Sequence, residues 1–313
     1  MFQPEVQELA TEATEAAEGG FNAGETIIGH VANTPIDHPL IHLPTVYGID
    51  LSVTKHVFML WLVAAVVFFA VTISVRRYLR QERMVPRGFM GPLEVIVEFL
   101  RDSVVQPNVG NKWVKTWAPL LLTLFVFILA ANAIGMIPIF ETLELLNHWV
   151  IHAPEESFFV QLLHGGSTAT SNFNVTAGLA VISFVAIIIA GTKAHGFIKH
   201  WKNLMPGGVS PVVGVMLIPI EIMGMFVRPF ALTMRLAANM TGGHIAILTI
   251  LSFVFIFAEL AGRALVGIGL GVVFSVPLAV GISALEIIVV LVQAYVFTLL
   301  TAVFVGMAIH VHH

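Results

Sequence analysis

Residues 211–262 read PVVGVMLIPIEIMGMFVRPFALTMRLAANMTGGHIAILTILSFVFIFAELAG. As a single α-helix this stretch would be about 75 Å long, because each residue rises by about 1.5 Å. The hydrocarbon core of a bilayer needs only about 30 Å. The segment therefore either crosses a membrane at a steep tilt or bends at Pro211, Pro219 or Pro229. In both cases polar groups lie part-way through the membrane, which is tolerated only against protein or water.

The composition of the whole chain is typical of a membrane protein. Of its 313 residues, 57% are hydrophobic and 11% are charged, and the mean hydropathy is +0.91. Soluble domains carry about 25% charged residues, so an ordinary soluble enzyme and a disordered protein are excluded. The net charge of -4 argues against a nucleic-acid partner, and the lack of cysteine excludes a disulfide scaffold. The predicted class is an all-α polytopic membrane protein.

Apolar runs of membrane-spanning length recur along the chain. We expect five transmembrane helices, at about 55–75, 117–139, 174–192, 211–262 and 270–309. The last two would form a long, steeply tilted hairpin. Residues 88–105 have apolar positions at helical spacing and acidic residues on another face, which predicts one amphipathic helix on the membrane surface.

Charge placement predicts the orientation of these helices. The first 50 residues hold eight acidic residues and no lysine or arginine. Eleven of the 15 basic residues lie in 76–115 and 193–202, which the positive-inside rule places in the cytoplasm. We therefore expect an acidic extracytoplasmic segment at 1–50, a membrane domain at 51–313, the N-terminus outside and the C-terminus in the cytoplasm.

Ionisable and amide side chains concentrate in the last two segments, where they are costly and indicate function. They are Glu221, Arg228, Arg235, Asn239, His244, Glu286 and Gln293. Glu221, Arg228 and Arg235 are seven residues apart, about two helical turns, so they share one stripe. Glu286 and Gln293 are also seven residues apart on the second segment.

An antiparallel hairpin places opposite residues at a nearly constant sum of residue numbers. His244 with Glu286 and Arg235 with Gln293 have nearly equal sums, and the turn would fall near residue 265. Histidine and desolvated carboxylates exchange protons in the accessible pH range, whereas arginine stays charged. From the residues alone, this order indicates two proton-access paths separated by an arginine that repels protons and attracts a carboxylate.

The run from Arg228 to His244, RPFALTMRLAANMTGGH, resembles the signature of subunit a of rotary F-type ATP synthases, R-P-x-x-L-x-x-R-L-x-x-N-M-x-x-G-H. The last segment agrees, with Glu286 followed by QAYVF at 293–297. Further matches lie upstream, at Pro119, Asn132, Pro138 and Asn174-Val175-Thr176. The resemblance extends from about residue 55 to the C-terminus.

In that family, subunit a is the stator that faces a rotating ring of c subunits. The resemblance implies that Arg235 is the essential arginine, which attracts the deprotonated carboxylate of each passing c subunit and blocks direct leakage. It implies an inner half-channel that involves Glu221. The side chains implied to line the outer half-channel are Asn239, His244, Glu286 and Gln293.

The resemblance also implies partners and a location. The partners would be the c-subunit ring, the peripheral-stalk b subunits, the lipid bilayer and, indirectly, the F1 sector, in a bacterial plasma (inner) membrane. The chain departs from some members of the family at Gly135, where they carry an acid, so the second span is not expected to supply a titrating group. Some members exchange the His and Glu of positions 244 and 286.

Other interpretations of the same residues stay open at this point. Arg235 lies midway along its segment, too deep for easy snorkelling, but His244 and Glu286 could be a structural ion pair. Asn239 and Gln293 could simply join helices by hydrogen bonds. The histidines make no closed ligand set, so no metal or cofactor is expected. No nucleotide-binding motif is present, and the chain alone is not expected to hydrolyse ATP.

Two other functions compete with the stator. A self-contained proton-coupled transporter or channel commonly shows inverted repeats and a midplane site of its own, and no repeat is visible here. A non-conducting scaffold would favour small residues at helix interfaces and would not need Arg235, Glu221 and His244 in one segment.

Overall fold

The computed structural model describes residues 24, 41, 43–44, 52–80, 88–137, 147, 169–202, 211–260 and 264–310. Nearly all of the expected extracytoplasmic segment lies outside these residues, as do the hairpin turn at 261–263 and most of the loop between the second and third spans. Within the described residues, β pairing is confined to an isolated bridge between Ile41 and Val53.

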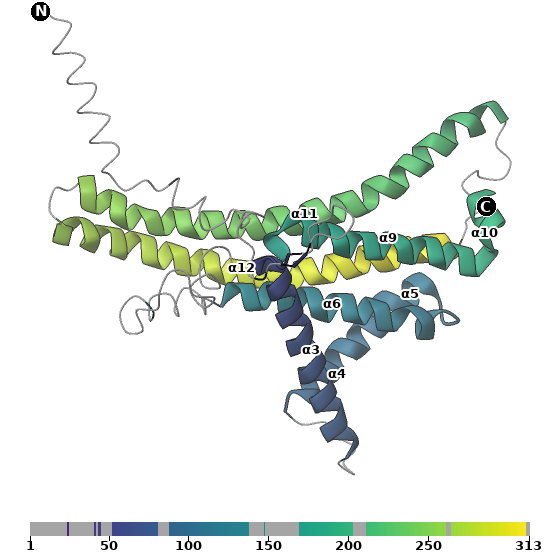
Figure 1. Ribbon diagram of the computed structural model, residues 1–313, viewed down its shortest axis with the longest axis horizontal. Coiled ribbons are helices and arrows are strands. Elements are labelled where there is room, and N and C mark those ends of the chain that lie inside the picture. Colours follow the sequence, from purple (N-terminus) through teal and green to yellow (C-terminus); the bar gives the residue numbers. More distant parts are fainter. Residues whose placement is uncertain are drawn as a thin grey trace, which may run out of the picture. The chain divides into compact units, whose positions relative to one another are not determined.

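The described chain is otherwise a succession of helices (Figure 1). In order they are α3 (Lys55–Leu79), α4 (Met90–Phe99), the π-helix η1 (Leu100–Val105), α5 (Gln106–Val109), α6 (Val114–Met136), the 3-10 helix η3 (Ala169–Ser171), α9 (Phe173–His195), α10 (Phe197–Lys202), α11 (Pro211–Leu260) and α12 (Ala264–Ile309). Five described helices, α3, α6, α9, α11 and α12, are long and apolar enough to cross a membrane. The predicted fold class, an all-α polytopic membrane protein, is confirmed.

The prolines do not interrupt α11, which contains Pro219 and Pro229 and is assigned as one helix. Membrane helices tolerate proline because neighbouring groups satisfy the backbone that it leaves unpaired. The apolar part, Met216–Val254, has 39 residues, or about 58 Å at 1.5 Å per residue. Of the two alternatives in the sequence, a break or a steep tilt, the described helix shows no break, and the tilt stays a prediction.

A helix is present where the surface helix was expected, although it is longer and less regular than predicted, and its place on the membrane surface stays a prediction. It runs from Met90 without a gap through η1 and α5, and it ends at Gly110, whose φ of 76° favours glycine. The wider turn of η1 changes the helical register. As a result Leu100, Val104, Val105 and Val109 are all fully buried, although two of them are sequence neighbours.

The chain divides into two compact units, each described separately. The smaller unit contains Thr241–Glu286, and the larger contains Asn33–Met240 with Ile287–His313. In the smaller unit α11 and α12 approach closely at a glycine: a Cβ on Gly271 would lie 2.5 Å from the Cα of Val254. Small residues allow such backbone contact between membrane helices.

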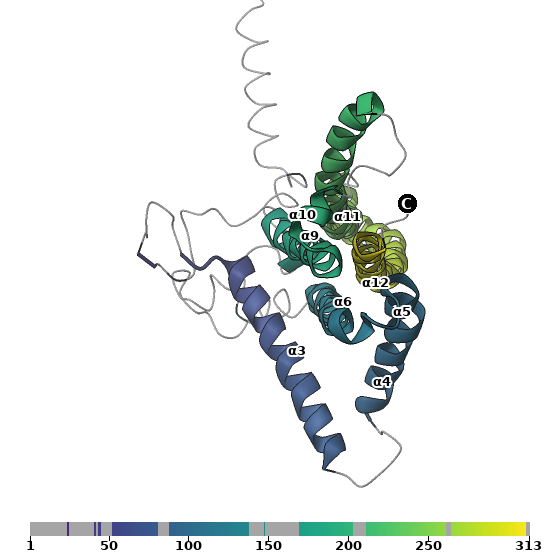
Figure 2. The ribbon, with the colours of Figure 1, turned by 90° about the vertical axis from the view of Figure 1, so that its right-hand side faces the viewer.

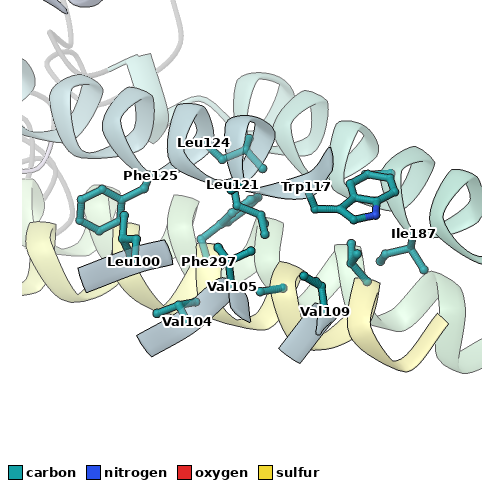
Figure 3. Packing of buried hydrophobic residues seen from close by; sticks show 14 of the residues in the cluster. Leu100, Val104, Val105, Val109, Trp117, Leu121, Leu124, Phe125, Ile187 and Phe297 are labelled. Atoms are coloured by element: carbon teal, nitrogen blue, oxygen red, sulfur yellow. The ribbon is translucent and has the colours of Figure 1, made fainter. Parts of the chain in front are cut away.

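The apolar core of the larger unit joins the surface helix to four membrane helices, α6, α9, α11 and α12 (Figure 3). Figure 2 shows α6 beside α3 and α9 in this unit. The labelled core residues are Leu100, Val104, Val105 and Val109 from η1 and α5, Trp117, Leu121, Leu124 and Phe125 from α6, Ile187 from α9 and Phe297 from α12. The packing fixes the end of α12 that carries the family-like QAYVF run.

Polar contacts and close backbone approach add to this packing. The hydroxyl of Thr301 on α12 donates to the Ser183 hydroxyl on α9 over 3.2 Å. Nε2 of His195 lies 2.9 Å from the carbonyl oxygen of Ile309. A Cβ on Gly306 would collide with the backbone of Asn108, so α12 and α5 touch directly.

Candidate functional site

One face of α11 in the larger unit is exposed along its length. Exposed positions recur every three or four residues, as expected for one helical face. They include Ile220, Met223, Val227, Phe230, Met234, Arg235, Ala238 and Asn239. The opposite face is buried at Met225, Leu232, Leu236 and Met240. Most of the exposed stripe is apolar, as a membrane helix requires.

Along α11, Arg235 is the one charged residue in the sequence between Arg228 and His244, and it belongs to the exposed stripe. Its side chain is exposed, and within the described part of the chain it makes no hydrogen bond and no ion pair. Arginine does not deprotonate in proteins. A permanent cation on an apolar membrane face is costly, so the position calls for water or for an anion from another chain.

Arg228, seven residues earlier, has a different environment. Its Nη2 lies 3.2 Å from Oε1 of Glu221, and its guanidinium lies 5.3 Å from the ring centre of Phe304. The predicted stripe of Glu221, Arg228 and Arg235 therefore holds one ion pair and one arginine without a carboxylate among the described residues. Glu221 is partly exposed.

The two amide side chains differ in exposure. Asn239 is exposed on α11, one turn beyond Arg235, whereas Gln293 is buried on α12. The antiparallel register agrees with the contact of Arg228 with Phe304, which has nearly the same sum of residue numbers as Arg235 with Gln293. No hydrogen bond joins Arg235 to Gln293 in the described residues.

The smaller unit brings His244 and Glu286 together, as the sequence predicted. Glu286 is 4% exposed, and His244 lies near enough to interact electrostatically with its carboxylate. A Cβ on Gly243 would lie 2.5 Å from Oε1 of Glu286, so the carboxylate rests on the glycine backbone. Among the described atoms, Oε1 has no hydrogen-bond partner. It is an open acceptor for water or a proton.

Sequence reasoning did not assign a role to the buried hydroxyl groups of the larger unit. Thr170 donates to Oδ1 of Asn132 over 2.5 Å, and Ser183 meets Thr301 as described above. Thr176 is fully buried on the same face of α9 as Ser183. Their signal in the sequence was the seven-residue spacing of hydroxyl residues in an apolar helix.

A second group of histidines lies in the larger unit. His200 on α10 is 7% exposed, and its ring fills the space that a side chain on Gly191 would take. Burial, and then the nearby charge of His195, lowers the pKa of His200. Among the described residues no group of three histidine, aspartate or glutamate side chains could hold a metal ion. Gly135, the departure noted in the sequence, is buried in α6.

These features define a polytopic helical membrane protein with a fixed cation on the exposed face of one long helix and a half-buried histidine beside a buried carboxylate. The sequence model of the family described as ATP synthase A chain matches residues 57–306. The chain belongs to this family. The role of the family is proton transport in the membrane sector of ATP synthase.

Curated relatives agree over most of the chain. The ATP synthase subunit a of Chlorobium phaeobacteroides is 37% identical over 300 residues, which cover 94% of this chain and 77% of that protein. The ATP synthase subunit a 2 of Prosthecochloris aestuarii is 37% identical over 305 residues, 95% of this chain and 83% of the relative. The ATP synthase subunit a of Myxococcus xanthus is 37% identical over 266 residues, which cover 85% of this chain and 75% of that protein.

Proposed function

We propose that this chain is the proton-conducting stator subunit of a rotary ATP synthase. In this proposal Arg235 faces the carboxylates of a rotating c-subunit ring, and two offset half-channels carry protons to and from that ring. The observation that carries the proposal is the exposed guanidinium of Arg235, on an apolar helix face and without a carboxylate partner among the described residues. A ring carboxylate would supply the missing anion.

The energies of this arrangement are of the right size. An arginine and a carboxylate about 4 Å apart attract each other by about 4 kcal/mol at an effective dielectric constant of 20. Moving one elementary charge through 100 mV corresponds to about 2.3 kcal/mol. Attraction to Arg235 is thus comparable with the driving force, so a ring carboxylate can be held and then released by protonation. Because Arg235 keeps its proton, it separates the two half-channels.

The outer half-channel would be lined by His244, Glu286, Asn239 and Gln293. The buried Glu286 carboxylate, whose Oε1 has no hydrogen-bond partner among the described atoms, supports this assignment. An imidazole and a carboxyl group can both take up and release protons. Asn239 and Gln293 would orient water by hydrogen bonds.

The inner half-channel would begin at Glu221. Its partial exposure supports access from water. The ion pair with Arg228 is itself partly exposed, so it is weak and does not withdraw the carboxylate from proton exchange. Arg228 would hold Glu221 in place and rest on Phe304.

Orientation and partners complete the proposal. We place the N-terminus and the acidic 1–50 segment outside, the membrane domain at 51–313, and the C-terminus in the cytoplasm of a bacterium, because arginines follow α3 and lysines follow α9. Peripheral-stalk b subunits would hold the chain still, and the F1 sector would receive the rotation. The chain itself would bind no nucleotide.

A self-contained transporter is the competing function. Such a protein commonly binds its substrate between helices of its own, often with a paired charge at the midplane. Within the described residues no carboxylate meets Arg235, and its side chain points to the exposed face of its unit. This observation favours a partner chain as the source of the anion.

The test uses inverted membrane vesicles that contain the assembled complex. ATP-driven acidification and passive proton leak are measured together in the wild type and in Arg235→Ala. We expect loss of pumping with normal assembly, and a higher passive leak because the barrier between the half-channels is removed.

The matched control is Arg77→Ala, an exposed arginine in the last turn of α3. This variant loses the same charge at a site away from α11 and should pump normally. Full pumping by Arg235→Ala would refute the stator mechanism. Proton transport by the chain alone, reconstituted without a c-ring, would favour the transporter instead.

A further inference from the structure

A cavity of about 750 Å³ lies in the larger unit between α3, α4 and α6. Figure 2 shows α4 to the right of α3, with α6 between them near their upper ends. The walls from α3 and α6 are mainly apolar and include Phe68, Val71, Val126 and Phe127. A volume of this size is within the range of about 300–1,000 Å³ found for small-molecule sites.

The third wall is charged. Glu94, Glu98 and Arg101 follow one another at helical spacings of four and three, and all three line the cavity. Glu94 is half-buried, and Glu98 and Arg101 are exposed. The cavity is thus amphipathic, with an apolar body and a polar side formed by the surface helix.

The charges on this wall do not cancel. Arg101 is engaged by its neighbour: Nε lies 2.7 Å and Nη2 3.0 Å from the two carboxylate oxygens of Asp102. Glu94 and Glu98 have no hydrogen bond or ion pair with any described residue. Two carboxylates therefore remain for a cationic group, and the outward N–H groups of Arg101 remain for an anion next to it.

We propose that this cavity is a binding site for a zwitterionic phospholipid with a primary ammonium headgroup. The acyl chain lies against the apolar walls of α3 and α6. The ammonium donates hydrogen bonds to Glu94 and Glu98, and the phosphate lies beside Arg101. This arrangement satisfies both signs of charge on the wall and fills the apolar body with hydrocarbon.

Charge distinguishes this lipid from other lipids. An anionic lipid would be repelled, because its negative charge would lie next to the carboxylates of Glu94 and Glu98. A choline headgroup has no N–H to donate to them.

The test measures which lipids stay with the assembled complex. The complex is exchanged into vesicles of equal parts phosphatidylethanolamine and phosphatidylglycerol, extracted in mild detergent, purified, and analysed by native mass spectrometry and lipid mass spectrometry. We expect phosphatidylethanolamine to be enriched over the bulk ratio. The double variant Glu94→Gln, Glu98→Gln should lower that enrichment by about five- to tenfold. This factor lies between the loss expected for one exposed ion pair and the loss expected for one charge-assisted hydrogen bond.

A second variant tests the apolar body of the cavity. Val71→Trp should fill the space and displace the lipid, whereas Val181→Trp, on the exposed face of α9, adds the same volume outside the cavity. Equal lipid retention in wild type, the glutamine variant and Val71→Trp would overturn the proposal. A preference for phosphatidylglycerol, or crosslinking of a partner helix to Val71, would overturn it as well.

Discussion

Replacing Gly243 by alanine should impair proton transport while leaving the complex assembled. The new Cβ would lie 2.5 Å from Oε1 and 2.9 Å from Cδ of Glu286, whereas ordinary contact begins near 3.4 Å. The carboxylate must therefore withdraw by about 0.9 Å. Glu286 is buried, so the movement forces its side chain away from a favourable rotamer, at about 0.5–1.5 kcal/mol.

The cost to folding is small because alanine favours the helix by about 1 kcal/mol over glycine. The cost to function is larger. Increasing the distance between the Glu286 carboxylate and a cationic partner from about 4 to 5 Å weakens their attraction by about 0.8 kcal/mol at a dielectric constant of 20. Together with the loss of alignment along the path, we expect ATP-driven pumping to fall by about three- to tenfold.

The assay compares pumping in inverted vesicles with the amount of assembled complex. Gly178→Ala is the matched control, because a Cβ at this glycine of α9 meets no atom within 4 Å. Adding Glu286→Asp to Gly243→Ala shortens the acid and should restore part of the rate. Wild-type pumping by Gly243→Ala would show that the carboxylate position in the structure does not matter for transport.

Two further predictions concern the larger unit. Gly306→Ala should destabilise the complex by about 1–3 kcal/mol, since its Cβ would strike the backbone of Asn108; thermal unfolding against Gly178→Ala checks this, and an unchanged transition would contradict the close packing. Burial and His195 lower the pKa of His200, so the unfolded chain binds a proton that the folded chain does not, and stability should fall as pH drops below about 6.5. His200→Gln should flatten this slope in thermal unfolding between pH 7 and 5, and an equally steep slope in that variant would assign the effect to another group.

Much of the architecture was predictable from hydrophobicity and spacing. The expected spans at 55–75, 117–139 and 174–192 correspond to α3, α6 and α9 within a few residues. The pairing of His244 with Glu286 followed from the antiparallel register, because opposite positions in a hairpin of two straight helices have a constant sum. The span positions depend on local hydrophobicity, and the pairing depends only on the geometry of an antiparallel hairpin.

Other features could not be read from the sequence. The π-helical turn at Leu100–Val105 depends on how two adjacent valines reach the core, which is set by the helices that pack on them. The continuity of α11 through Pro229 depends on the surroundings of the helix rather than on proline itself. Neither the π-helical turn nor the continuity of α11 produces a periodic pattern of residues in the sequence.

Hydropathy, charge asymmetry and the run from Arg228 to His244 were sufficient to establish the fold class, the location of the helices and the family, because each is a property of residue order. Spacing alone treats Arg228 and Arg235 alike, as two arginines on one stripe, and only the depth of Arg235 and the family resemblance single it out. Folding distinguishes them by placing Glu221 and Phe304 against the first and neither against the second. The cavity beside Glu94 likewise exists only because side chains of α3, α4 and α6 line one space. Pairing and cavities depend on which distant side chains share a space, and that is a property of tertiary packing alone.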